Sequence, residues 1–276
     1  MSVSKISRDI NKRKHGRDFD QIREVKVTPH IFKYSDGSVL FQLGDTSVLC
    51  SVKVEKGVPI FLRGQGKGWL TAEYALLPAS SSSRSVRDSS LPRGQNGRSV
   101  EISRLIGRVF RSIVNLDTFG EFTIFIDCDV LNADGGTRCA AITGASLALL
   151  IAQSKWLETG FISTSVLQDT IAAISVGAYQ GQVLLDIDYS EDNTIDADYN
   201  FVMTRSGDII EIQGTSETAP IPWEMFLSMR QIAQKGIGEL CKLTDQLSGC
   251  TDKQQKKFPK KNSGFTLGDR LGKISI

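Results

Sequence analysis

The sequence of 276 residues contains only two histidines, His15 and His30. Histidine is the side chain that most often activates a serine or cysteine nucleophile, so a Ser–His or Cys–His mechanism has little support. The phosphate-binding loop of nucleotide kinases, Gly-x-x-x-x-Gly-Lys followed by Ser or Thr, is also missing. Other groups are therefore better candidates for the chemistry of this chain.

Cysteine is scarce as well, and no Cys-x-x-Cys pair occurs among the five cysteines, at positions 50, 128, 139, 241 and 250. This usage disfavours a disulfide framework and a zinc site, and it is typical of the reducing cytoplasm. No apolar run reaches the length of a membrane span, and residues 1–17 lack the apolar centre of a signal peptide. We therefore expect a cytoplasmic protein with no membrane association.

Charge is unevenly distributed, although the net charge is only +2. Residues 251–276 contain seven Lys and Arg against two Asp and Glu, which predicts a basic, flexible C-terminal tail. Such a tail is either a soluble extension or an aid in holding a polyanion. Because 40% of the residues are apolar, residues 1–250 can form a sizeable core, and we expect a single domain there.

The chemistry is concentrated between a predicted strand over residues 122–130 and a predicted helix over residues 140–156. The junction between them reads Gly135-Gly136-Thr137-Arg138. Glycines let a backbone approach a ligand, the first amides of a helix are unpaired donors, and arginine offers a planar fork to phosphate. The junction thus predicts an anion site, although a plain turn with a surface arginine has the same pattern.

Arginines gather upstream of this strand. Residues 79–97 predict a mobile surface loop, whose three arginines, Arg84 and Arg87 among them, either keep it soluble or grip a phosphate backbone. A helix with one apolar stripe follows, with Ser99 as its predicted N-cap. Arg98 would then lie at the positive end of the helix, where an anion partner is favoured, so it is a candidate phosphate ligand.

Six carboxylates lie within the thirteen residues from Asp186 to Asp198. A solvated acidic loop and a divalent-metal site both fit this pattern, since hard cations such as Mg²⁺ are held by carboxylates and water. Hairpins are predicted around Gly44, Gly181 and residues 205–208. Together with the helices, they predict an α+β fold with helices packed against mixed sheets.

Six longer segments resemble the ribonuclease PH family of phosphorolytic 3′-to-5′ exoribonucleases. They are Arg13-Lys-His-Gly-Arg17, Gly57-Val-Pro-x-Phe-Leu-x-Gly-Gln-Gly66, Gly68-Trp-Leu-Thr-Ala-Glu-Tyr74, Gly97-Arg98-x-x-Glu101-Ile-x-Arg104-Leu-Ile106, Asp127-Cys-Asp-Val-Leu-x-Ala-Asp-Gly-Gly-Thr-Arg138 and Ile212-Gln-Gly-Thr215. The likeness covers about residues 7–245, and six motifs in family order are far more specific than any one of them.

The resemblance implies the ribonuclease PH fold, which is related to domain 2 of ribosomal protein S5. It also implies a homohexamer, built as three dimers, that trims the 3′ ends of tRNA precursors with inorganic phosphate as co-substrate and requires Mg²⁺. The same reaction can run backwards and add nucleotides.

Residue by residue, the resemblance assigns three sets of ligands. It implies phosphate binding by Arg98, Gly136, Thr137 and Arg138, catalysis and metal binding by Asp192 and Asp198, and RNA binding by Arg84 and Arg87. Which carboxylate donates a proton and which binds metal is left open. Ala79 stands where the family commonly has an arginine, and the segment from Ser89 to Gly97 is one residue longer.

A catalytically inactive RNA-binding subunit of an exosome-like ring is the main alternative. Such relatives typically lack the phosphate arginines or the paired aspartates, whereas this chain has all of them. Polynucleotide phosphorylase is a second alternative, but it carries two such domains and further RNA-binding modules, for which 276 residues leave no room.

Overall fold

The computed structural model describes residues 13, 16–87, 96–218 and 220–248. The predicted tail at 251–276 lies outside the described residues. Within them, the chain forms two β-sheets and four α-helices, with short 3₁₀ turns at Ile60–Leu62 and Leu116–Thr118.

The first sheet has five strands in the order β1-β2-β3-β5-β4. They are β1 (Val25–Pro29), β2 (Gly37–Leu43), β3 (Thr46–Lys56), β4 (Trp69–Leu76) and β5 (Phe122–Asn132). The predicted hairpin around Gly44 joins β2 to β3, and the period-2 pattern of β5 places its buried side chains on one face. β4 and β5 are parallel, so the chain between them crosses over through a helix.

The second sheet is antiparallel, with the order β7-β6-β8-β9. Its strands are β6 (Ile171–Tyr179), β7 (Gln182–Leu185), β8 (Ala197–Thr204) and β9 (Ile209–Ser216). The predicted hairpins around Gly181 and residues 205–208 are both confirmed. β6 is buried on both faces, because α2 packs on one side of the sheet and α4 on the other.

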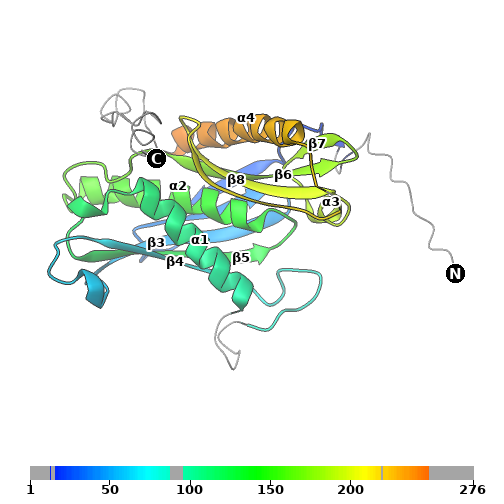
Figure 1. The fold of residues 1–276 in the computed structure, drawn as a ribbon. Helices are drawn as coiled ribbons and strands as arrows, with labels where there is room; N and C mark the ends of the chain where they lie inside the picture. Colours follow the sequence, from blue (N-terminus) through cyan, green and yellow to red (C-terminus); the bar gives the residue numbers. More distant parts are fainter. Residues whose placement is uncertain (1–12, 14–15, 88–95, 219, 249–276) are drawn as a thin grey trace, which may run out of the picture.

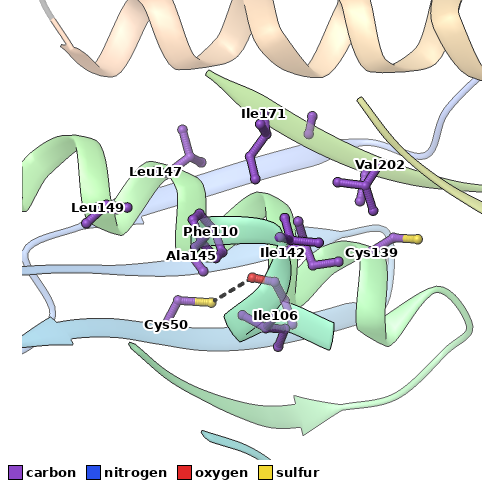
Figure 2. Close-up of a cluster of buried hydrophobic side chains, with 14 of the residues drawn as sticks. Cys50, Ile106, Phe110, Cys139, Ile142, Ala145, Leu147, Leu149, Ile171 and Val202 are labelled. Atoms are coloured by element: carbon purple, nitrogen blue, oxygen red, sulfur yellow. Dashed lines mark hydrogen bonds between the residues drawn. The ribbon is translucent and has the colours of Figure 1, made fainter. Parts of the chain in front are cut away.

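Four helices complete the fold: α1 (Gly97–Ile113), α2 (Thr137–Glu158), α3 (Tyr189–Asp192) and α4 (Trp223–Ser248). Figure 1 shows the layers, with α4 over the second sheet, α2 between the sheets, and α1 beside β4. One cluster of buried side chains runs through these layers around α2, and part of it is drawn in Figure 2. The predicted α+β architecture is confirmed.

α2 is apolar around most of its circumference, because both sheets pack against it. Among the described helices it is long and apolar enough to span a membrane, with 22 residues, but 72% of its apolar window is buried. The expectation that no segment reaches that length is therefore corrected. Burial inside the protein identifies α2 as a core helix.

The helix starts also differ from those predicted. α1 begins at Gly97, and its N-cap is Asn96, whose side chain accepts a hydrogen bond from the Arg98 amide at 3.1 Å. Ser99 is instead a buried residue of the first turn. α2 begins at Thr137, earlier than the predicted start at residue 140, so the arginine of the Gly-Gly-Thr-Arg junction belongs to the helix. Both shifts bring the candidate phosphate ligands into first helical turns.

Candidate active site

The junction between β5 and α2 is a tight left-handed turn. Gly135 has a φ of 78° and Gly136 a φ of 65°, which L side chains rarely adopt. A Cβ added to Gly135 would also lie 2.7 Å from the carbonyl carbon of Asp188. The glycine pair is therefore required by the turn and by close packing against the 186–192 segment. The turn leads directly into the N-terminus of the 22-residue helix α2, whose free amides attract anions.

Thr137, the first residue of α2, is buried and is hydrogen-bonded by Tyr74 of β4. The Tyr74 hydroxyl donates to Thr137 Oγ1 at 2.9 Å, and the Tyr74 amide donates to Ser103 Oγ of α1 at 2.9 Å. Burial raises the pKa of Tyr74, which keeps its hydroxyl protonated. Because Thr137 Oγ1 accepts this bond, its own hydrogen is left to donate to a ligand.

Arg138 is held between α1 and the second sheet. Its Nη1 donates to Gln213 Oε1 of β9 and lies 3.8 Å from Glu101 Oε1 of α1. Its side chain is 19% exposed, so the guanidinium is oriented by the protein while one side still reaches solvent. This orientation suits a planar, charge-assisted contact with phosphate.

Arg98 contributes a second positive charge to the same region. It lies in the first turn of α1 with an exposed side chain. Its charge acts on the pKa of Asp192, of Asp198 and of Tyr74, and the charge of Arg138 acts on those of Asp198 and Tyr74. The structure thus brings the predicted phosphate residues and the predicted carboxylates into one electrostatic neighbourhood.

Asp192 ends α3, and Asp198 lies on β8 opposite Thr215 of β9. Burial raises the pKa of Asp198 to about 6, the negative charge of Asp192 adds to the shift, and Arg138 opposes it. Burial also raises the pKa of Asp192, Arg98 opposes that shift, and Glu217 adds to it. Two carboxylates whose pKa values are raised by burial and by neighbouring acids are typical of a functional site.

These two carboxylates also fit a magnesium site by the chemistry of their atoms. Mg²⁺ is commonly bound by one or two carboxylates, with water and substrate phosphates completing its shell. Among the residues that the structure describes, no group of three or more His, Cys, Asp or Glu is arranged to hold a metal. At Asp192 and Asp198, the carboxylate pair and the phosphates of the substrate would together supply the ligands.

Three of the six carboxylates in the acidic segment form ion pairs inside the protein and do not belong to the candidate metal site. A buried network joins three arginines to three carboxylates: Arg13, Arg17 and Arg23 with Asp186, Asp188 and Glu191. The segment is therefore not a wholly solvated loop. The three arginines are noticeable in the sequence, but no sequence pattern links them to partners that lie more than 160 positions away.

Arg84 and Arg87 are exposed in the segment that follows β4. Burial raises the pKa of Asp129 on β5, and the charge of Arg87 opposes that shift, so Arg87 lies near the outer face of the first sheet. The rest of their predicted loop, residues 88–95, lies outside the described residues. Among the described residues, none of the hydrogen bonds or ion pairs joins these two arginines to the phosphate turn.

Tyr74, Gln213 and Glu217 were not singled out from the sequence as functional residues. Tyr74 and Gln213 lie inside two of the family-like segments, and this position could have identified them as candidate functional residues. Glu217, just beyond β9, has no comparable signal and is found only through its effect on the two aspartates.

Two family models match the chain in succession. The 3′ exoribonuclease family, domain 1, matches residues 21–155, and domain 2 of that family matches residues 169–236. Ribonuclease PH of Neisseria meningitidis serogroup B is 50% identical over 224 residues, which are 81% of this chain and 92% of that protein. Ribonuclease PH of Neisseria meningitidis serogroup C has the same identity and coverage.

Solved structures show the same fold at lower identity. Rice Rrp46 (Oryza sativa) superposes with a TM-score of 0.69 at 19% identity, covering 85% of this chain and 100% of that one. A chain of the Archaeoglobus fulgidus exosome with RNA bound to the active site gives 0.69 at 21% identity, covering 84% and 92%. By its fold, its matched domains and its identity to these relatives, the chain belongs to the ribonuclease PH family of 3′ exoribonucleases.

Proposed function

We propose that this protein is a phosphorolytic 3′-to-5′ exoribonuclease that releases nucleoside diphosphates from RNA ends. The observation that carries the proposal is the neighbourhood of Arg98, Thr137 and Arg138 with the carboxylates Asp192 and Asp198. One half of this site suits an inorganic phosphate, and the other half suits the leaving end of an RNA strand.

The nucleophile in this reaction is inorganic phosphate, which is already anionic and requires no histidine base. Its repulsion from the RNA phosphodiester is the main obstacle. Arg98 and Arg138 offset that repulsion, and the Thr137 hydroxyl and the α2 amides donate to the bound anion. Positioning and electrostatics thus account for most of the catalysis, as in other phosphoryl transfers.

In the chemical step, an oxygen of inorganic phosphate bonds to the phosphorus of the terminal diester. The bond from that phosphorus to the preceding ribose O3′ breaks, and O3′ takes a proton. We assign proton donation to Asp198, whose pKa near 6 keeps a protonated fraction at neutral pH. We assign Asp192 as the ligand of Mg²⁺, which when bound supplies charge neutralisation at the diester.

We further propose that the substrates are tRNA precursors and that the enzyme is a cytoplasmic homohexamer of three dimers. Support for an assembly comes from the outer face of α1, where Arg104 is exposed; Arg108 is exposed there too, but it donates to Glu211 Oε1 of β9 in the same chain at 3.1 Å. Arg111, on the same helix, faces β4 instead, because it donates to the Leu70 carbonyl at 2.9 Å and lies over the Trp69 ring at 4.8 Å. Light scattering tests the assembly, and a monomer with full activity would contradict it.

The alternative of an inactive RNA-binding ring subunit is less well supported. Such a role requires neither a built phosphate turn nor paired carboxylates with raised pKa values. Both features are present here.

The identity of the released nucleotide tests the proposed function. A 3′-extended tRNA is incubated with and without inorganic phosphate, and the mononucleotide products are separated by chromatography. We expect nucleoside diphosphates only with phosphate, and extension of the RNA when diphosphates are supplied. Monophosphates formed at the same rate without phosphate would show that water attacks, and the proposed function would be wrong.

Replacement of Arg84 and Arg87 by alanine should weaken tRNA binding and flatten its salt dependence. For every RNA phosphate that an arginine no longer neutralises, the log–log salt slope should fall by about 0.7 to 0.9. Binding is measured by fluorescence anisotropy across a salt series, with Lys26→Ala as the control, since Lys26 is exposed on β1 and pairs with Glu24 at 3.2 Å. Turnover of a dinucleotide should hardly change. Equal losses on short and long substrates would place these arginines in the reaction centre instead.

A further inference from the structure

Asp186 is a buried carboxylate in an unusual backbone conformation. It lies between β7 and α3, is fully buried, and has a φ of 54°. A left-handed conformation is uncommon for a residue with a side chain and persists where the surrounding contacts enforce it. The Asp186 amide donates to the Ser175 carbonyl at 2.8 Å, and its carbonyl accepts from Arg13 at 3.0 Å and from Arg17 at 2.9 Å.

The carboxylate of Asp186 is bound on both oxygens by Arg23. Nε of Arg23 donates to Oδ2 at 2.9 Å, Nη2 donates to Oδ1 at 2.7 Å, and the Arg23 amide adds a bond to Oδ2 at 2.8 Å. The Arg23 side chain is only 5% exposed. This two-point contact fixes the guanidinium in one orientation relative to the 186–192 segment.

The other edge of the same guanidinium binds the phosphate turn. Arg23 Nη1 donates to the Asp134 carbonyl, and Arg23 Nη2 donates to the Gly135 carbonyl at 3.3 Å. Thr46 Oγ1 of β3 donates to the same Gly135 carbonyl at 2.7 Å and accepts from the Asp134 amide at 3.1 Å. The carbonyls that precede Gly136 are thus held by Arg23 and Thr46.

Arg23 therefore stands between two halves of the site that different parts of the chain supply. On one side is the turn that carries Gly136, Thr137 and Arg138. On the other side is the segment from Asp186 to Asp192, which packs against Gly135 so closely that a Cβ there would lie 2.7 Å from it. Buried ion pairs are weak evidence for added stability, so a role in fixing geometry is the better account of this one.

The geometry points to Arg23 and Asp186 as positioning residues that set the spacing between the phosphate turn and the catalytic carboxylates. This inference rests on the proposed function of the site. In-line attack requires the bound phosphate and the leaving-group acid to be held in register, and a displacement of about 1 Å is enough to cost about a hundredfold in rate. Arg23 touches neither substrate in this assignment and acts through the turn and the 186–192 segment.

Arg23→Lys tests the inference, because it keeps the positive charge and removes the two-edged contact. At saturating RNA, and well below the melting temperature, the KM for phosphate should rise about tenfold and kcat should fall. Arg13→Lys is the matched control: Arg13 is equally buried and binds Glu191 at 2.7 Å and the Asp186 carbonyl, but within the described contacts it does not touch the turn. Its phosphate KM should stay within about twofold, even where stability falls.

Thr46→Val serves if Arg23→Lys does not fold, since it removes only the hydroxyl contacts to the turn and should also raise the phosphate KM. A lower melting temperature with an unchanged phosphate KM would make Arg23 merely structural and would overturn the inference. Equal phosphate KM changes in Arg23→Lys and Arg13→Lys would overturn it too. Both of these outcomes would leave the proposed function intact, because the wild-type enzyme would still require phosphate. Release of monophosphates by the wild-type enzyme without phosphate would instead contradict the proposed function.

Discussion

Asp198→Asn should abolish phosphorolysis while phosphate and RNA still bind. The substitution keeps the shape of the side chain but removes its acid, and general acid catalysis typically contributes about 10²- to 10⁴-fold to a rate. We therefore expect kcat to fall by that factor. Single-turnover assays on a 3′-labelled RNA measure the chemical step, and equilibrium binding of RNA and of phosphate is measured on the same preparation.

Asp196→Asn is the matched control for this variant. Asp196 belongs to the same acidic segment, but it accepts hydrogen bonds from the Gln180 amide at 2.8 Å and from Thr218 at 3.2 Å. Its substitution should leave kcat within about threefold of wild type, because its partners are structural. If Asp198→Asn retained more than about a tenth of wild-type kcat, another group would have to be the acid.

The same aspartate should make the stability of the metal-free protein depend on pH. Burial raises the folded-state pKa of Asp198 from 3.8 to about 6. The folded state therefore binds a proton more tightly than the unfolded chain, so this stabilising contribution is full below pH 3.8 and is lost as the pH rises through about 6. In magnesium-free buffer, Asp198→Asn should melt at a higher temperature than wild type at pH 7, and the difference should shrink toward pH 4. A difference that is independent of pH would contradict this account.

Arg138→Ala should weaken the use of phosphate by about ten- to a hundredfold. The substitution removes a charge-assisted hydrogen bond to the anion, for which about 1.5 to 3 kcal/mol is typical, and each 1.4 kcal/mol is about a factor of ten. The guanidinium contacts only the half-buried Gln213 and the exposed Glu101 among its described partners, so the loss of these contacts should change the fold little. The KM for phosphate at saturating RNA measures the effect.

Arg138→Lys separates charge from geometry in this prediction. Lysine keeps the positive charge but lacks the planar fork, so its phosphate KM should fall between those of wild type and Arg138→Ala. RNA affinity should be nearly unchanged in both variants. If RNA affinity fell as strongly as phosphate affinity in both, Arg138 would contact the RNA and not the attacking anion.

The elements on either side of the phosphate turn follow from local patterns, and for that reason the sequence predicts them. Alternation over residues 122–130 predicts β5, and the apolar run after Arg138 predicts α2. The sequence places the N-cap of α1 at Ser99, whereas Asn96 caps the helix, because both residue types cap helices and only the backbone decides between them. Local pattern thus identifies elements better than their ends.

Contacts between distant parts of the chain were beyond prediction from one sequence. Arg13 and Glu191 are separated by 178 positions and Arg138 and Gln213 by 75, and no periodicity connects either pair. The family-like segments contain the phosphate residues, and the family resemblance assigned the two aspartates outside those segments, but the residues that hold them in place emerged only from the folded chain. The role of residues 251–276 stays a prediction, because they lie outside the described residues.

The bridge from Arg23 to Asp186 also bears on when the site can form during synthesis. Arg23 is made early, and its partner follows 163 positions later. Ribosomes add about 5 to 20 residues per second, and the earlier parts of a chain begin to fold first. The first sheet and α2 can therefore assemble while the phosphate turn still lacks its second anchor. A nascent or truncated chain that ends before residue 186 would contain the phosphate arginines, but Asp186 would not be there to fix the phosphate turn through Arg23. The ability to attack RNA is therefore acquired late, after both halves of the sequence have emerged.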